Sequence, residues 1–185
     1  MRGAINYNRG RFDRYTASCY GGQTQALGCN FGPPRMVPDP ANPGQLKPIF
    51  SGQDLSGTKL TRAPTWTGNI GFDFERPISS SLKIGLSADA NYSDGYLTEA
   101  SSKPAGFQRR YALVDGTIRL AAADNQWEIA AIGRNLTNRY YFVRSGDQVF
   151  TGSGTGDAVG VRADTAANVN RGRELFLRLT LRFGK

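Results

Sequence analysis

Cys19 and Cys29 lie ten positions apart in a polar, Gly- and Pro-rich segment, and the chain has no other cysteine. This placement predicts one disulfide that closes a loop in an oxidising compartment. Two unrelated free thiols are the alternative. The sequence has no histidine and no Cys-x-x-Cys pair, so we expect neither a zinc site nor a redox motif.

Catalytic chemistry has little support in this sequence. Without histidine, and with both cysteines predicted to be bridged, the usual pairs of nucleophile and base are missing. Asp73, Glu75 and Asp89 could supply a carboxylate pair for sugar hydrolysis. They alternate with apolar residues, however, and are better explained as partners of basic side chains on neighbouring strands. We therefore predict no catalytic residue, no bound cofactor, no metal site and no enzymatic activity.

Residues of the polar segments suggest ligands only weakly. Gly152–Gly156 resembles a phosphate-binding loop superficially, but it lacks the following Lys-Ser/Thr and is better explained as a flexible loop. Asp147, Asp157 and Asp164 could hold calcium, although their irregular spacing favours solvated loop acids. The loop aromatics could stack on a planar ligand or pack within the loops; they are Tyr15, Tyr20, Phe31, Phe50 and Phe150.

The elements that must position these residues are β-strands. Successive side chains of a strand point to opposite faces, and alternation of apolar and polar residues is the strongest pattern in this chain. Most of the segments are close to the ~9–11 residues that a tilted strand needs to cross a bilayer. Five segments alternate clearly and a sixth less so: 66–75, 82–93, 111–120, 127–134, 174–183 and 3–12.

The two faces of these predicted strands differ in charge. In a membrane barrel such faces meet a wet lumen and lipid, whereas in a soluble sandwich they meet bulk water and a second sheet. Alternation alone does not distinguish the two. We expect the following to face the lumen: Asp73, Glu75, Lys83, Asp89, Asp115, Arg119, Arg134, Glu174, Arg178 and Arg182. We expect the following to face lipid, in a set that carries no charge: Ile70, Phe72, Phe74, Ile84, Leu86, Leu175, Leu177, Leu179, Leu181 and Phe183.

The connections between the predicted strands alternate in length, which favours the barrel. Antiparallel strands put successive connections at opposite ends, so all long loops share one side, as in outer-membrane barrels. Aromatic residues near the strand ends would form two girdles at the membrane interfaces. The short turns are 77–80 and 122–126, the long loops, predicted to be extracellular, are 13–64, 94–110 and 138–172, and Lys185 would be periplasmic.

The net charge, the apolar stretches and the N-terminal segment bear on the partners of the chain and on whether it is a fragment. The net charge of +8 invites a nucleic-acid partner, but the basic residues are scattered and we discount one. The sequence contains no stretch of 18 apolar residues, so it predicts no transmembrane helix. The chain opens without an export signal, and six strands would leave unpaired edges in hydrocarbon. We therefore expect a fragment whose natural N-terminus lies upstream.

Three segments, in this order, carry a family resemblance. Asp54–Thr67 (DLSGTKLTRAPTWT) has a Gly-x-x-Leu-x-x-Ala-Pro run that enters a strand, Gly133–Tyr141 (GRNLTNRYY) ends the next-to-last strand, and Arg173–Phe183 closes the chain. Together they resemble the C-terminal part of TonB-dependent receptors over nearly the whole chain. Asn135-Leu136-Thr137 also matches a glycosylation sequon, which we interpret as structural. Gly184-Lys185 depart from the family, which usually ends on an aromatic residue.

The resemblance implies an all-β fold, an antiparallel meander of about six long strands at the C-terminal end of a 22-stranded transmembrane β-barrel. Residues 1–185 would belong wholly to that barrel domain, without the plug. The implied function is TonB-dependent uptake of a siderophore, cobalamin or glycan across a Gram-negative outer membrane. The implied partners are membrane lipid, the TonB complex acting on the missing N-terminal part, the barrel-assembly machinery and the nutrient. A soluble β-sandwich that binds carbohydrate or another ligand is the rival interpretation.

Overall fold

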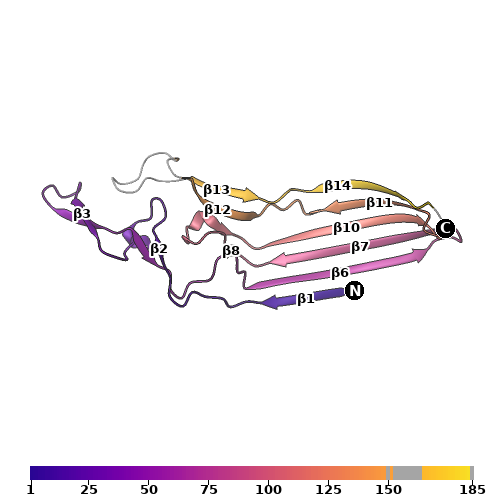
Figure 1. The fold of residues 1–185 in the computed structure, drawn as a ribbon, viewed down its shortest axis with the longest axis horizontal. Helices are drawn as coiled ribbons and strands as arrows, with labels where there is room; N and C mark the ends of the chain where they lie inside the picture. The colour runs from indigo at the N-terminus through magenta and orange to yellow at the C-terminus, as the bar shows by residue number, and fades with distance from the viewer. Residues whose placement is uncertain (149–150, 152–163, 184–185) are drawn as a thin grey trace.

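A computed structural model describes residues 1–148, 151 and 164–183. The chain is all-β, and six long strands form one antiparallel sheet in the order β1-β6-β7-β10-β11-β14 (Figure 1). Strands that follow one another in sequence are also neighbours in the sheet, which confirms the predicted meander. The strands are β1 Arg2–Tyr7, β6 Trp66–Pro77, β7 Leu82–Ser93, β10 Tyr111–Ala122, β11 Trp127–Arg134 and β14 Glu174–Leu181.

The strand ends differ from the predicted ones at a few places. β1 stops at Tyr7 rather than near Phe12, because the Asn8 side chain accepts a hydrogen bond from the Gly10 amide at 2.8 Å and starts a turn. β6 continues to Pro77, so Arg76, opposite Ile84, lies on the face predicted to be free of charge. That expectation was wrong at this one position. Arg182 and Phe183 follow the end of β14.

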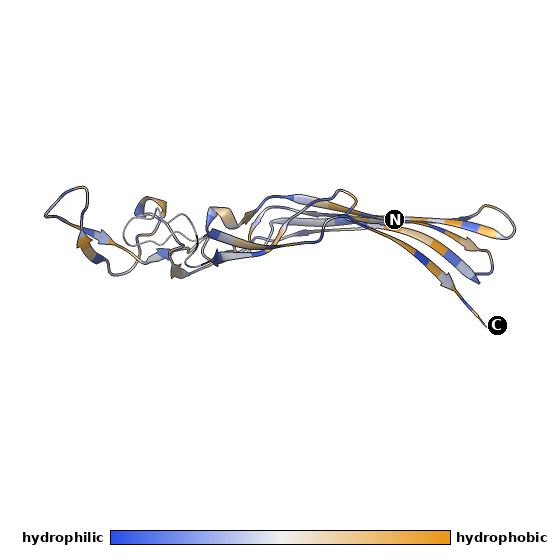
Figure 2. Ribbon diagram, turned by 90° about the horizontal axis from the view of Figure 1, so that it is seen from above, coloured by the Kyte–Doolittle hydropathy of each residue, from blue (hydrophilic) through white to orange (hydrophobic). Residues whose placement is uncertain are grey.

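The sheet is open and consists of a single layer. Its edges are β1 and β14, and none of the other described elements lies over either face of the six strands (Figures 1 and 2). The few buried apolar residues in the described part of the chain are Cys29, Leu55, Ala121, Ala122 and Ala130, and those of the sheet are all alanines. The sheet therefore has no hydrophobic core of its own.

The three long connections contain short elements that the sequence did not predict. They all lie at one end of the sheet, while the two short turns lie at the other (Figure 1). The short strands pair locally: β2 Thr16–Ser18 with β5 Gly52–Asp54, β3 Arg35–Pro38 with β4 Leu46–Ile49, β8 Tyr96–Leu97 with β9 Phe107–Gln108, and β12 Phe142–Gln148 with β13 Asp164–Val169. Two 3₁₀ turns are η1 Gln25–Leu27 and η2 Pro104–Gly106. Within the described ranges, no helix is long and apolar enough to span a membrane.

Candidate functional site

One face of the sheet gathers the predicted charged residues. Because directly opposed residues of an antiparallel pair share a face, the strand register brings them onto one surface, here called the charged face. Six of its side chains are acidic and six are basic. They are Asp73, Glu75, Asp89, Asp115, Glu128 and Glu174, with Arg2, Lys83, Arg119, Arg134 and Arg178 and with Arg182 just beyond β14.

Arg2 joins two carboxylates on different strands. Its Nη1 donates to Asp73 Oδ2 at 2.6 Å and its Nη2 donates to Asp89 Oδ1 at 2.7 Å. Gly71 lies between Arg2 and Asp89 in the same cross-strand row. A Cβ at Gly71 would lie 2.4 Å from Asp89 Oδ1 and 3.0 Å from Arg2 Nε, so the glycine leaves room for this ion pair.

Glu75 is the centre of a second group of charges. It accepts from Lys83 Nζ at 3.0 Å and from Arg119 Nη2 at 3.1 Å. Arg119 reaches Glu75 across the whole width of β7, where Gly85 is the intervening residue. A Cβ at Gly85 would lie 2.0 Å from Arg119 Nε and 2.6 Å from its Cγ, so this contact also depends on a missing side chain.

The other members of the charged face are paired more locally. Asp115 lies opposite Asp89, and its Oδ1 accepts from the Asn135 amide at 2.7 Å. Arg178 donates to Glu128 at 3.0 Å, and the Arg134 guanidinium lies 5.6 Å from the centre of the Phe176 ring. Glu174 accepts from Arg171 at 3.2 Å, and Arg182 donates to the Asn125 carbonyl at 2.6 Å. The carboxylates considered for sugar hydrolysis, Asp73, Glu75 and Asp89, thus pair with basic side chains as predicted.

The opposite surface, here called the apolar face, carries the residues predicted to face lipid. Most of its large side chains are exposed among the described residues, although Leu136 packs over Gly116 and Gly133. Leu177 is 78% exposed, Leu175 is 72% exposed and Phe183, just past β14, is 88% exposed. Ile70, Phe72, Phe74, Leu179 and Leu181 are also exposed, whereas Ile84 and Leu86 in the middle of the sheet are half-buried.

Asn135 ties three parts of the chain together where β11 ends. Its backbone is left-handed (φ 48°) and its side chain is buried. Nδ2 donates to the carbonyls of Arg139 at 2.9 Å and Arg171 at 3.1 Å, while Oδ1 accepts from the Arg139 amide at 2.9 Å. With Nδ2 committed in this way, the sequon at Asn135 has a structural role, as predicted.

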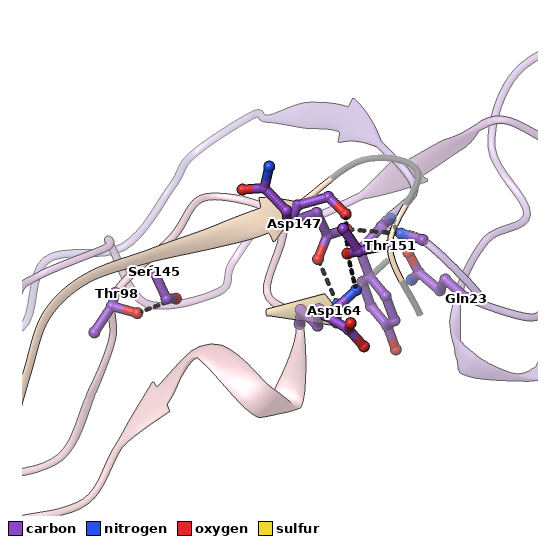
Figure 3. Close-up of polar contacts among 10 residues, drawn as sticks. Gln23, Thr98, Ser145, Asp147, Thr151 and Asp164 are labelled. Carbon is purple, nitrogen blue, oxygen red and sulfur yellow. Dashed lines mark hydrogen bonds and ion pairs between the residues drawn. The ribbon is translucent and has the colours of Figure 1, made fainter. Parts of the chain in front are cut away.

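Hydrogen bonds connect the three long loops into one unit, here called the loop cluster (Figure 3). Asp147 in the third loop pairs with Lys103 in the second and accepts from the Gly21 amide of the first at 2.9 Å. Thr98 and Ser145 share a buried hydroxyl contact of 2.5 Å. The Gln53 amide of the first loop donates to the Ser101 carbonyl of the second at 2.8 Å. None of these contacts between distant segments was predicted from the sequence.

Glu99 carries the main electrostatic cost within the loop cluster. Burial raises the pKa of its carboxyl group above the ordinary 4.5, the nearby Asp147 raises it further, and Lys103 opposes the shift. Its Oε1 is buried and has no hydrogen-bond partner among the described residues. The charged form of Glu99 is therefore less favourable in the folded cluster than in water.

The first loop contains the predicted disulfide. Cys19 and Cys29 are bonded, with their Cα atoms 5.6 Å apart. Tyr20 and Phe50 line a cavity of about 670 Å³ beside the disulfide, whereas Tyr15 stacks on Phe12 with ring centres 4.3 Å apart.

Several predictions about the loops fall partly outside the described residues. Asp157, Phe150, the 152–156 loop, Gly184 and Lys185 lie there. Among the residues that the structure covers, no group of three or more metal-ligating side chains occurs. The chain matches no protein-family model, no curated protein and no solved structure.

Proposed function

We propose that this chain is the C-terminal part of a 22-stranded outer-membrane barrel, from a TonB-dependent receptor that takes up a bulky nutrient. The observation that carries the proposal is the difference between the two faces of a single-layer sheet. Contiguous apolar surface that is exposed on this scale marks a membrane or a binding interface. The reverse face, with equal numbers of acidic and basic side chains, is suited to a water-filled lumen.

Strand length supports the membrane setting. β6, β7 and β10 have 12 residues each. At about 3.3 Å per residue such a strand is ~40 Å long, and a tilt of ~40° gives it a height of ~30 Å. That height equals the ~30 Å hydrocarbon core of a bilayer. Arg76, the charge on the apolar face, lies near the turn end of β6, where a long side chain can reach the polar interface.

The open edges support membership of a larger barrel. Unpaired amide and carbonyl groups in hydrocarbon cost several kcal/mol each, so β1 and β14 need partner strands within the membrane. Since β1 and β14 run in opposite directions, an even number of further antiparallel strands closes the barrel between them. Strands upstream in the same polypeptide would supply that closure.

The loop arrangement supports the proposed orientation and role. All long loops share one end of the sheet (Figure 1), as extracellular loops do in outer-membrane barrels. The charged face is balanced, so the excess positive charge of the chain lies outside it, mainly in the loops. This distribution suits the capture of an anionic nutrient such as a metal chelate.

The first test is the DNA upstream of codon 1. We expect one continuous frame that encodes an export signal, a plug and further alternating strands. A stop codon and a ribosome-binding site immediately before Met1 would refute membership of a larger barrel. That result, with a soluble product, would support the rival sandwich module.

The second test measures lipid contact directly, in the protein made from the complete frame. Leu177→Trp on the apolar face and Phe176→Trp on the charged face are adjacent in β14 and form a matched pair. In vesicles that contain brominated lipid, we expect the fluorescence of Trp at 177 to be quenched and that at 176 to be spared. Equal quenching at the two positions would contradict the proposed assignment of faces.

A further inference from the structure

The β3–β4 hairpin of the first loop places its two cations on the same face. Arg35 opposes Ile49 and Val37 opposes Lys47, so the register puts both cations on one face. The other face carries Met36 and Leu46, which are 50% and 61% exposed. On the face with the cations, Arg35 is exposed, whereas Lys47, Val37 and Ile49 are half-buried.

The face with the two cations borders a cavity. Arg35, Lys47 and Ile49 form one wall of the 670 Å³ cavity, and the segment closed by the Cys19–Cys29 disulfide forms the other. Tyr20 and Phe50 add aromatic surface. The volume lies within the ~300–1,000 Å³ that small-molecule sites usually have.

The charge around this cavity is of one sign. No acidic residue occurs among the described residues that line it. Arg35 has no hydrogen-bond or ion-pair partner within the described ranges. Asp39 lies close enough to interact with Lys47, but it occupies the hairpin tip, where it accepts from the Ala41 amide at 3.0 Å and from Asn42 at 2.7 Å. Its pKa is lowered chiefly by the Asn42 hydrogen bond.

Arg35 and Lys47 are diagonal neighbours across the hairpin. Diagonal Cα atoms are ~7–8 Å apart, and the long side chains can converge on one group between them. Two like charges repel when they share a face, and an anion between them would turn the repulsion into two charge-assisted hydrogen bonds. An isolated two-stranded hairpin is only marginally stable, so such a ligand would also stabilise β3 and β4.

We propose that this cavity binds a small organic anion with an apolar or aromatic body. Its phosphate or carboxylate group would lie between Arg35 and Lys47, and its body would pack against Tyr20, Phe50 and the disulfide. The β3–β4 hairpin is at the end of the molecule far from the sheet (Figure 1), which separates the site from any bilayer around the strands. The site is defined by loop geometry alone and does not depend on membrane insertion.

The experiment uses 1-naphthyl phosphate as probe and the protein made from the complete frame, folded in detergent micelles. With ¹³C-labelled isoleucine methyl groups, Ile49 reports on the cavity, and isoleucines of the sheet such as Ile118 serve as internal references. We expect the Ile49 signal to shift saturably while the reference signals stay fixed. Inorganic phosphate has only the anionic group of the probe and uncharged 1-naphthol has only its aromatic body. Each should therefore bind at least about tenfold more weakly than the probe.

Variants identify the residues responsible. Arg35→Gln and Lys47→Gln should each lower the affinity for the probe about tenfold, because each removes one charge-assisted contact. Arg110→Gln removes an exposed cation outside the cavity and should leave binding unchanged. Bound probe should also slow reduction of the Cys19–Cys29 disulfide by dithiothreitol, which tests the same site independently of the variants.

Two outcomes would overturn the proposal. The first is no saturable Ile49 shift in a sample whose disulfide is intact by mass spectrometry. The second is binding that persists unchanged when Arg35 and Lys47 are both replaced by Gln.

Discussion

The most informative perturbation of the fold is at Asn135, where one buried side chain holds segments that are far apart in sequence. Asn135→Ala removes three hydrogen bonds between its side chain and the backbone, to the Arg139 carbonyl, the Arg171 carbonyl and the Arg139 amide. It also removes a contact from the Thr137 hydroxyl, which has the Ala112 carbonyl as a second acceptor. At about 0.5–1.5 kcal/mol each, the three bonds to the backbone sum to about 1.5–4.5 kcal/mol, and the Thr137 hydroxyl keeps its second acceptor. Alanine also tolerates the left-handed backbone poorly, which adds about 1 kcal/mol. We expect the free energy of unfolding to fall by about 3–5 kcal/mol.

Two further substitutions at Asn135 separate the contributions. Asn135→Gly keeps the left-handed backbone at no steric cost, so its loss should be about 1 kcal/mol smaller than that of alanine. Asn135→Asp keeps the acceptor for the Arg139 amide but turns an oxygen toward two carbonyl groups. It should be as harmful as alanine at neutral pH and recover partly below about pH 4, where the carboxyl group regains a donor.

The assay is urea unfolding in detergent micelles, followed by tryptophan fluorescence, with Asn125→Ala as the matched control. Asn125 also has a left-handed backbone (φ 63°), but it is exposed and lies in the short turn after β10. It should therefore report the backbone cost alone. If Asn135→Ala is no more destabilising than Asn125→Ala, the proposed hydrogen-bond hub at Asn135 is wrong.

The remaining predictions concern the loop cluster and the charged face. Glu99→Gln should stabilise the loop cluster at neutral pH. With Glu99 present, the stability of the cluster should fall as pH rises from 4.5 through the elevated pKa of the folded state, and the substitution should remove this pH dependence. Hydrogen exchange of the loop amides measures both effects. Lys103→Met should speed exchange across residues 94–110 by leaving Asp147 half-buried without this ion-pair partner, and unchanged protection would contradict that role. Gly85→Val should change the free energy of unfolding by less than about 1 kcal/mol, because the ion pair between Glu75 and Arg119 is half-exposed. It should nevertheless abolish the coupling between these two residues in a double-mutant cycle, because the new side chain would occupy the space of Arg119.

The sequence predicted the elements whose signal is local. Alternation over 66–75, 82–93 and 111–120 marked long strands, because a period of two has few other structural explanations. The Cys19–Cys29 disulfide followed from composition and spacing. The short strands β8 and β9 were missed because two residues each are too few to show a period.

The sequence alone did not predict which charged residues pair with one another. Arg2 and Asp89 are far apart in the chain, and only the register across Gly71 makes them partners. A shift of one residue in that register would have moved every side chain to the other face. The link from Asn135 to the Arg171 carbonyl likewise depends on how the third loop returns to the sheet.

The lack of a core leads to a last prediction, about the solvent that this sheet needs. Folding in water is driven mainly by apolar burial, yet the buried apolar residues described in the sheet are all alanines and the leucines of β14 are mostly exposed. Net hydrogen-bond energies of the ladder are too small to offset the chain entropy alone.

For the protein made from the complete frame we therefore expect no cooperative urea transition in buffer without detergent. In micelles we expect one, since the acyl chains would cover the apolar face and the upstream strands would pair with β1 and β14. Circular dichroism and light scattering on the same samples check this. A monodisperse monomer that unfolds cooperatively without detergent would mean that protein covers Leu177 and Phe72, and the membrane interpretation of the apolar face would fail with it.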